Sequence, residues 1–220
     1  MTISAPAKFG DRFGLKLLLA VVLATAAVFI WTSSHYQQQG KQKDTWVDER
    51  GKLHVLGITL GTSDLRQAEL ALQSRSEVAL YRYPAEHPKA GLKLEAYFPA
   101  IADHTQVILL LEATPEMLKQ MEARASAPQL FQNRVARLSL APEDSQLTSR
   151  MTVRELTLIP SVTVTAESLS ARFGIPGQIL HPIPATTLYR FPVIGLEAIL
   201  SPDEPSQLHF TNPVPALFYR

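Results

Sequence analysis

The chain has 220 residues, and its 21 basic and 20 acidic side chains leave a formal net charge of +1. This length allows one large domain or two small ones. The small net charge argues against a nucleic-acid-binding protein, which needs a basic surface to displace counterions. The chain has no cysteine, which excludes disulfides, thiolate metal sites, a cysteine nucleophile and a lipid-modified N-terminal cysteine.

An apolar segment near the N-terminus begins at Phe13 and ends at Trp31. As a helix it would be about 28 Å long, close to the thickness of the hydrocarbon core of a bilayer. Basic side chains precede it, so the positive-inside rule predicts a cytoplasmic N-terminus at residues 1–12. We therefore predict a transmembrane anchor at residues 13–32, a polar linker at 33–45 and a periplasmic remainder, in an inner (plasma) membrane protein. A signal peptide cleaved after Ala26 is the alternative.

One short string occurs twice in the remaining chain. Residues 80–84 read Leu-Tyr-Arg-Tyr-Pro, and residues 188–192 read Leu-Tyr-Arg-Phe-Pro. Each copy is followed by Gly-Leu, at residues 91–92 and 195–196, and then by an alternating apolar run. A period of roughly a hundred residues indicates a duplicated domain rather than the short unit of a solenoid.

The first repeat is predicted to cover residues 46–112. Two short apolar runs on either side of an acidic, glycine-containing turn predict a hairpin at its start. Thr62 or Ser63 can cap a helix whose apolar positions, from Leu65 to Leu72, follow helical spacing. Alternating or continuous apolar runs then predict strands at residues 77–83, 92–97 and 106–111.

A connecting segment and the second repeat follow. In residues 113–152, Thr114 and Pro115 open a helix. A strand at 135–140 is broken by the polar residues after Ala141. In the second repeat, residues 153–212, Thr165 caps a short helix that ends at Gly174. Further strands are predicted at residues 152–159, 187–191, 196–200 and 207–210, and residues 213–220 form an irregular tail.

Together these patterns predict an α+β fold class. A single N-terminal transmembrane helix would be followed by two repeated units, each a short helix packed on an antiparallel meander sheet. In the second unit the pattern rests on Val162, Thr163, Leu169, Phe173, Gly174, Pro176, Tyr189 and Gly195. The first unit keeps Gly57, Thr59 and Leu65 but has Gln-Ser at residues 73–74, where Gly-x-Pro would fall.

This order of a capped helix, a Phe-Gly-x-Pro stop and a three-stranded meander resembles the SmpA/BamE-like outer-membrane assembly lipoproteins. Their wider fold group includes the β-lactamase inhibitor protein, itself a tandem repeat. The resemblance implies a module that works by binding other proteins. Because the chain lacks the lipidated cysteine and has a helical anchor, we expect it at the inner membrane, facing the periplasm.

No pattern in the sequence assembles a reactive site. The six histidines are widely separated and show no local ligand spacing. The string Gly-Thr-Ser-Asp at residues 61–64 lacks the nucleophile-elbow spacing and is explained by helix capping. No glycine-rich phosphate loop occurs. We therefore predict no catalytic, cofactor-binding or metal-binding residue and no cofactor.

The duplicated string supplies the candidate interaction residues, because tyrosine and arginine are enriched in binding hot spots. A purely structural role, with the arginine stacked between aromatic rings, is the alternative. The predicted function is a non-enzymatic protein-interaction module with an envelope protein as its partner and the membrane as its anchor site. An anchored enzyme or ligand-binding protein with a site between the repeats remains the second hypothesis. The candidate interaction residues are Tyr81, Arg82, Tyr83, Tyr189, Arg190 and Phe191.

Overall fold

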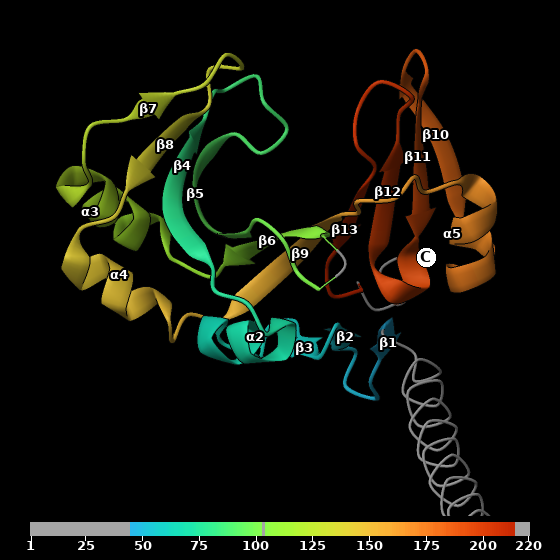
Figure 1. Cartoon of the computed structure of the whole chain (residues 1–220), viewed down its shortest axis with the longest axis horizontal. Helices are drawn as coiled ribbons and strands as arrows, with labels where there is room; N and C mark the ends of the chain where they lie inside the picture. The colour runs from blue at the N-terminus through green and yellow to red at the C-terminus, as the bar shows by residue number, and fades with distance from the viewer. Residues whose placement is uncertain (1–44, 103, 214–220) are drawn as a thin grey trace, which may run out of the picture. The chain divides into compact units, whose positions relative to one another are not determined.

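The computed structural model describes residues 45–102 and 104–213. In this part of the chain, thirteen strands form a three-stranded sheet and a ten-stranded sheet, accompanied by four α-helices. Both sheets are antiparallel throughout. Figure 1 shows the ten-stranded sheet bent so that one of its faces is concave.

The three-stranded sheet begins the described chain. It consists of β1 (Thr45–Val47), β2 (Leu53–Val55) and β3 (Ile58–Thr59). The Asp48 carboxylate accepts hydrogen bonds from the backbone N–H groups of Arg50 and Lys52, at 2.9 and 2.8 Å, and so closes the turn between β1 and β2. The predicted hairpin is confirmed by this pairing.

The ten-stranded sheet has the order β10-β11-β12-β13-β9-β6-β5-β4-β8-β7. Its strands include all of those predicted from alternation, together with two short or exposed strands that were not predicted, β7 and β10. The bounds are β4 (Glu77–Tyr83), β5 (Gly91–Phe98), β6 (Gln106–Leu111), β7 (Gln129–Leu130), β8 (Ala136–Ser139), β9 (Val153–Ile159), β10 (Gln178–Ile183), β11 (Thr186–Phe191), β12 (Leu196–Leu200) and β13 (Gln207–Phe210).

The two copies of the repeat form the two halves of this one sheet. The meander β4-β5-β6 and the meander β11-β12-β13 lie in mirror order on either side of β9, which pairs with both β6 and β13. The predicted fold class is therefore wrong. Instead of two units that each pack a helix on their own meander, the described chain forms one antiparallel ten-stranded sheet with a smaller sheet beside it.

The helices are α2 (Leu65–Leu72), α3 (Pro115–Arg124), α4 (Pro142–Thr148) and α5 (Ala166–Phe173). Thr114 and Thr165 cap α3 and α5 as predicted. The cap of α2 is Asp64, whose carboxylate accepts from the Gln67 N–H at 2.8 Å, rather than Thr62 or Ser63. The segment after Ala141, predicted only to break a strand, begins α4 because Pro142 fits the first helical position.

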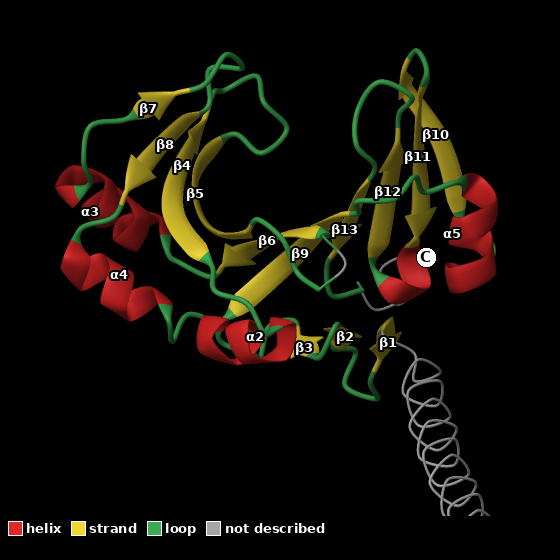
Figure 2. Ribbon diagram, in the orientation of Figure 1, coloured by secondary structure: helices red, strands yellow, loops and turns green. Residues whose placement is uncertain are grey.

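All four helices lie on the convex side of the ten-stranded sheet (Figure 2). The apolar residues of each strand that face this side are buried in one cluster that extends through both halves. Its largest fully buried side chains include Leu80, Leu94, Phe98, Leu156 and Phe210. The core therefore occupies the convex side, and the alternate residues of the same strands face the concave side.

No helix among the described residues combines the length and the apolar composition needed to cross a membrane. The predictions of a transmembrane helix, a signal anchor and membrane attachment are therefore not supported by this structure. The segment on which they were based, residues 13–32, lies outside the described residues. The inner-membrane localisation stays a prediction.

Candidate functional site

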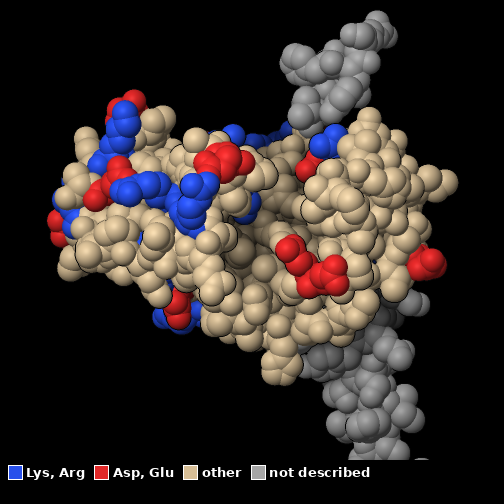
Figure 3. Space-filling view, turned by 90° about the horizontal axis from the view of Figure 1, so that it is seen from above, with Lys and Arg blue, Asp and Glu red and all other residues tan. Residues whose placement is uncertain are grey.

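The candidate site is the concave face of the ten-stranded sheet, which carries three neighbouring cavities of about 640, 390 and 280 Å³. Figure 3 looks onto this face from above and shows it hollowed. The first and second cavities share Glu197 and His209, and the second and third share Glu95 and Ile108. We call this continuous surface the concave groove.

The sheet register brings residues that are far apart in sequence into one row along the groove. Each residue of the row is the direct cross-strand neighbour of the next, and cross-strand neighbours have their side chains on the same face. The row therefore extends over both halves of the sheet. From β11 to β5 its members are Arg190, Glu197, His209, Thr157, Ile108 and Tyr97.

His209 lies at the middle of the row, with both ring nitrogens engaged. Its Nδ1 is 3.0 Å from the Thr157 hydroxyl, and its Nε2 is 3.4 Å from a carboxylate oxygen of Glu155. The hydrogen bond from His209 holds the pKa of Glu155 below its usual value, although partial burial opposes this shift. Thr157 is only 6% exposed. The histidine ring is therefore fixed between two neighbours on β9.

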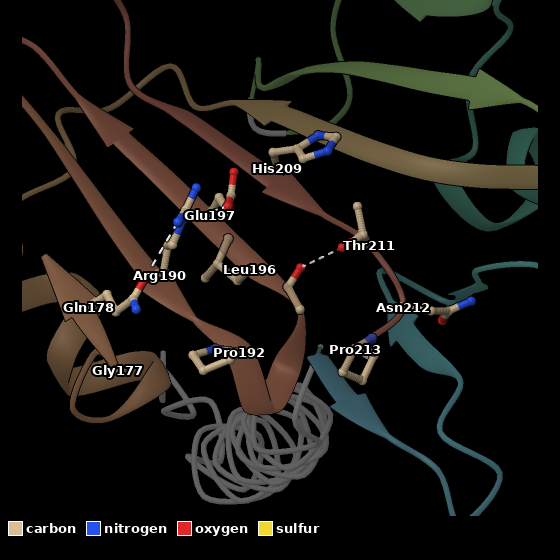
Figure 4. A pocket seen from close by; sticks show the side chains of 11 residues that line it. Gly177, Gln178, Arg190, Pro192, Leu196, Glu197, His209, Thr211, Asn212 and Pro213 are labelled. Atoms are coloured by element: carbon tan, nitrogen blue, oxygen red, sulfur yellow. Dashed lines mark hydrogen bonds and ion pairs between the residues drawn. The ribbon is translucent and has the colours of Figure 1, made fainter. Parts of the chain in front are cut away.

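An ion pair marks the end of the groove formed by the second repeat. The Nε of Arg190 is 2.7 Å from Oε1 of Glu197, and its Nη1 is 3.5 Å from Oε1 of Gln178. Figure 4 shows these side chains beside the cavity of about 640 Å³. The Arg190 Nε is buried and has no aligned hydrogen-bond acceptor among the described residues despite the short distance, so this contact is an ion pair of poor hydrogen-bond geometry.

Aromatic side chains dominate the other end of the groove. Tyr81, Tyr83 and Tyr97 line the cavity of about 280 Å³ together with Phe131. The Tyr83 hydroxyl donates to the buried carboxylate of Glu95, at 2.9 Å from Oε1. Burial and the neighbouring carboxylate raise the pKa of the Tyr83 hydroxyl far above its ordinary value, so it remains a neutral donor.

The predicted interaction residues of the first repeat divide between the two faces. Tyr81 and Tyr83 lie in the groove. Arg82 faces the convex side, where its Nε lies 2.8 Å from Oε1 of Glu122 on α3. This arginine therefore links β4 to a helix and is absent from the groove.

The second repeat shows the opposite arrangement. Arg190 lies in the groove, whereas Phe191 is 3% exposed and packs on Phe173 of α5, with ring centroids 5.9 Å apart. Tyr189 packs against the same core. The duplicated string thus presents two tyrosines to the groove in one copy and one arginine in the other.

A one-residue difference in strand pairing causes this reversal. Arg82 is paired with Leu92 of β5, whereas Arg190 is paired with Glu197 of β12, one residue beyond Leu196. Leu92 and Leu196 both belong to the convex side. A shift of one residue exchanges the two faces of a strand. The arginine side chains of the two copies therefore lie on opposite faces of the sheet.

Four charged or titratable residues of the groove were not predicted as site residues: Glu95, Glu155, Glu197 and His209. In each single strand these residues lie beside apolar residues that face the convex side. The pairing of β9 with both β6 and β13 is what makes them neighbours, and no local sequence signal predicts it. Among the described residues, no group of three histidine or carboxylate side chains could hold a metal ion.

Comparison of the chain with protein-family models, curated proteins and solved structures finds no match. The resemblance to SmpA/BamE-like proteins stays a prediction.

Proposed function

We propose that this protein is a non-enzymatic interaction module that binds a segment of another protein in the concave groove. The observation that carries this proposal is the uncovered concave face itself, which no helix of the described chain occupies. Tyrosine, arginine and glutamate side chains line this face together with apolar ones such as Ile108 and Ile199. Such a mixture of aromatic anchors and polar groups is typical of protein interfaces.

The chemistry of the groove favours binding over catalysis. Among the described residues, the hydroxyl that contacts His209 is that of Thr157, which is buried and therefore poorly placed to attack a substrate. The carboxylate on the other ring nitrogen, Glu155, has a lowered pKa and is a weak base. Adjoining cavities that extend over both halves of the sheet also suit an extended polypeptide better than one small substrate.

A small-ligand-binding function is the second candidate. The cavity of about 390 Å³ lies between the two meanders, and charged side chains from both halves converge on it. Its volume falls in the lower range for small-molecule sites. This candidate predicts that a small compound, rather than a protein, binds in the cavity. The charged and titratable lining residues are Lys89, Lys93, Glu95, Glu155, Glu197 and His209.

Site-specific photo-crosslinking of the full-length chain in its native cells tests the proposal. A photoreactive residue replaces Ile199, which lines the groove, and, as the control, Leu70 of α2, which is 71% exposed on the helix side. We expect a discrete protein adduct from position 199 and none from position 70. The absence of an adduct specific to position 199 would overturn the proposal.

The two copies of the repeated string supply matched variants. Arg190→Ala removes a groove side chain, and Arg82→Ala removes the same side chain from the opposite face. A hot-spot arginine costs 2 kcal/mol or more on truncation, so Arg190→Ala should reduce adduct formation by roughly thirtyfold. Arg82→Ala should leave it unchanged. Equal effects of the two variants would show that the groove is not the interface.

A further inference from the structure

The cavity of about 280 Å³ is lined by four aromatic residues together with Glu95, Ile108, Asn133 and Val135. Tyr81 and Tyr83 come from β4, Tyr97 from β5 and Phe131 from the chain just after β7. The rings of Tyr81 and Tyr83 are inclined by 30°, with centroids 6.3 Å apart. We call this site the aromatic cavity. The faces of aromatic rings carry partial negative charge and attract cations.

A carboxylate lies among these rings. Glu95 is only 5% exposed and lines the aromatic cavity from β5. Its two oxygens share one hydroxyl proton, that of Tyr83, at 2.9 and 3.1 Å. An ionised carboxylate can accept about four hydrogen bonds. Glu95 therefore keeps acceptor capacity beside the aromatic rings, and a positively charged donor there would make a charge-assisted hydrogen bond, which is stronger than a neutral one.

Lys89 shows that an ammonium group is compatible with these surroundings. Its Nζ lies 3.9 Å from Oε1 of Glu95 and 6.0 Å from the centre of the Tyr83 ring. This lysine comes from the loop between β4 and β5, and it lines the neighbouring cavity rather than the aromatic cavity. The carboxylate is thus approached by one cation from one side, whereas the described residues that line the aromatic cavity include no cationic one. Arg137 of β8, the cross-strand neighbour of Tyr81, lies outside this lining and has its Nη2 3.3 Å from the Glu77 carboxylate.

The alternatives to a cation are unfavourable. An anion would meet the Glu95 carboxylate and the negative ring faces. A purely apolar group would desolvate that carboxylate further without giving it a donor. The volume lies just below the range for drug-sized molecules, which suits a single amino-acid side chain.

We propose that the aromatic cavity receives a lysine or arginine side chain of the protein that occupies the concave groove. This inference rests on the proposed function, and it adds the chemistry of the partner. The partner segment presents a basic residue whose head group contacts Glu95 and whose stem packs on the tyrosine rings.

The first experiment probes the cavity without any partner. Full-length protein is titrated with N-acetyl-lysine methylamide and with the neutral analogue N-acetyl-norleucine methylamide, and ring-proton NMR shifts are followed. We expect saturable binding of the lysine compound, with a dissociation constant of about millimolar, and none of the norleucine compound. Equal binding of both compounds, or no binding of the lysine compound, would overturn the proposal.

Two variants locate the binding. Glu95→Gln keeps the size of the side chain and removes its charge, and Tyr97→Leu removes one ring without touching the Tyr83–Glu95 hydrogen bond. Each should weaken lysine-compound binding at least tenfold, whereas Arg82→Ala on the other face should have no effect. Undiminished binding in a folded Glu95→Gln or Tyr97→Leu variant would refute the assignment.

The partner itself is tested after its crosslinked segment has been identified. Replacing the lysine or arginine of that segment with norleucine should weaken binding at least tenfold. An unchanged affinity would overturn the inference and leave the proposed function intact. If photo-crosslinking from the groove gave no protein adduct, by contrast, the proposed function would be overturned, and the assignment of a basic partner side chain would fall with it.

Discussion

Gly91 and Gly195 hold corresponding places in the two repeats, each directly before the leucine that faces the convex side. Both have positive φ angles, +97° and +60°. Their surroundings differ, because a Cβ on Gly91 would meet open space, whereas a Cβ on Gly195 would lie 1.9 Å from the Thr211 carbonyl oxygen. The backbone of Thr211 is held in this position because its N–H donates a hydrogen bond to the Gly195 carbonyl at 2.9 Å.

This contrast predicts unequal costs for the same substitution. Gly91→Ala should lower the free energy of unfolding by about 1–2 kcal/mol, the strain of a positive φ. Gly195→Ala adds an overlap with backbone that cannot move aside and should cost about 1–3 kcal/mol more. Urea unfolding of the two variants measures the difference. Equal losses would mean that the turn at Thr211 shifts freely.

At the scale of residues, the sequence predicted which strand residues alternate between apolar and polar. It did not always predict which face of the sheet they occupy. The strand predicted at residues 92–97 is confirmed, and its residues alternate between the core on the convex side and the concave groove. The faces of the repeated Tyr-Arg string could not be predicted, because they depend on a one-residue difference in pairing with the next strand. That difference lies in the turns, where the first copy has a long loop and the second has a short 3₁₀ turn, Pro192–Ile194.

At the scale of elements, one side chain connects the three-stranded sheet to the end of β13. The Oδ1 of Asn212 accepts from the Leu53 N–H at 2.8 Å, and its Nδ2 donates to the Leu60 carbonyl at 3.0 Å. Leu53 and Leu60 are fully buried. Water therefore cannot easily replace either bond when the amide is removed.

We expect Asn212→Ala to lower the free energy of unfolding by about 1–3 kcal/mol, the cost of leaving buried backbone groups unsatisfied. Hydrogen exchange should accelerate at the Leu53 N–H before it accelerates in β6 or β9. Asn212→Asp is the matched variant, since it keeps the acceptor for Leu53 and loses the donor to Leu60. Unchanged exchange at Leu53 in the alanine variant would show that this amide does not hold the small sheet.

Three of the four helices of the described chain were predicted, and α4 was not. Caps act within a few residues, so Thr114 and Thr165 could be recognised locally. At α2, three neighbouring residues could serve as the cap, and the isolated bridge between Asp64 and Thr152 of a distant segment shows why Asp64 adopts the extended conformation required of one. β10 was missed because all six of its residues are exposed and it has no buried face to produce alternation.

At the scale of the whole described chain, the decisive feature is the shared strand β9. Duplication in the sequence suggested two units, but β9 joins the two meanders through continuous ladders on both of its sides. The cluster of buried apolar residues is continuous as well, from Leu53 to Phe210. The groove exists only because of this joining, since His209 of one half lies beside Ile108 of the other across Thr157.

This continuity predicts that residues 45–213 unfold as one cooperative unit. Phe210 in β13 is 1% exposed and packs against Phe173 of α5, so Phe210→Ala should cost about 3–5 kcal/mol. Because the two halves share β9, amides in β4 and β5 should lose protection by the same free energy as amides in β11 and β12. The control is Val193→Ala, an 82% exposed position in the same half, which should change neither set. If Phe210→Ala left β4 and β5 fully protected, each half would be stable by itself, and a groove formed jointly by both would have no thermodynamic basis.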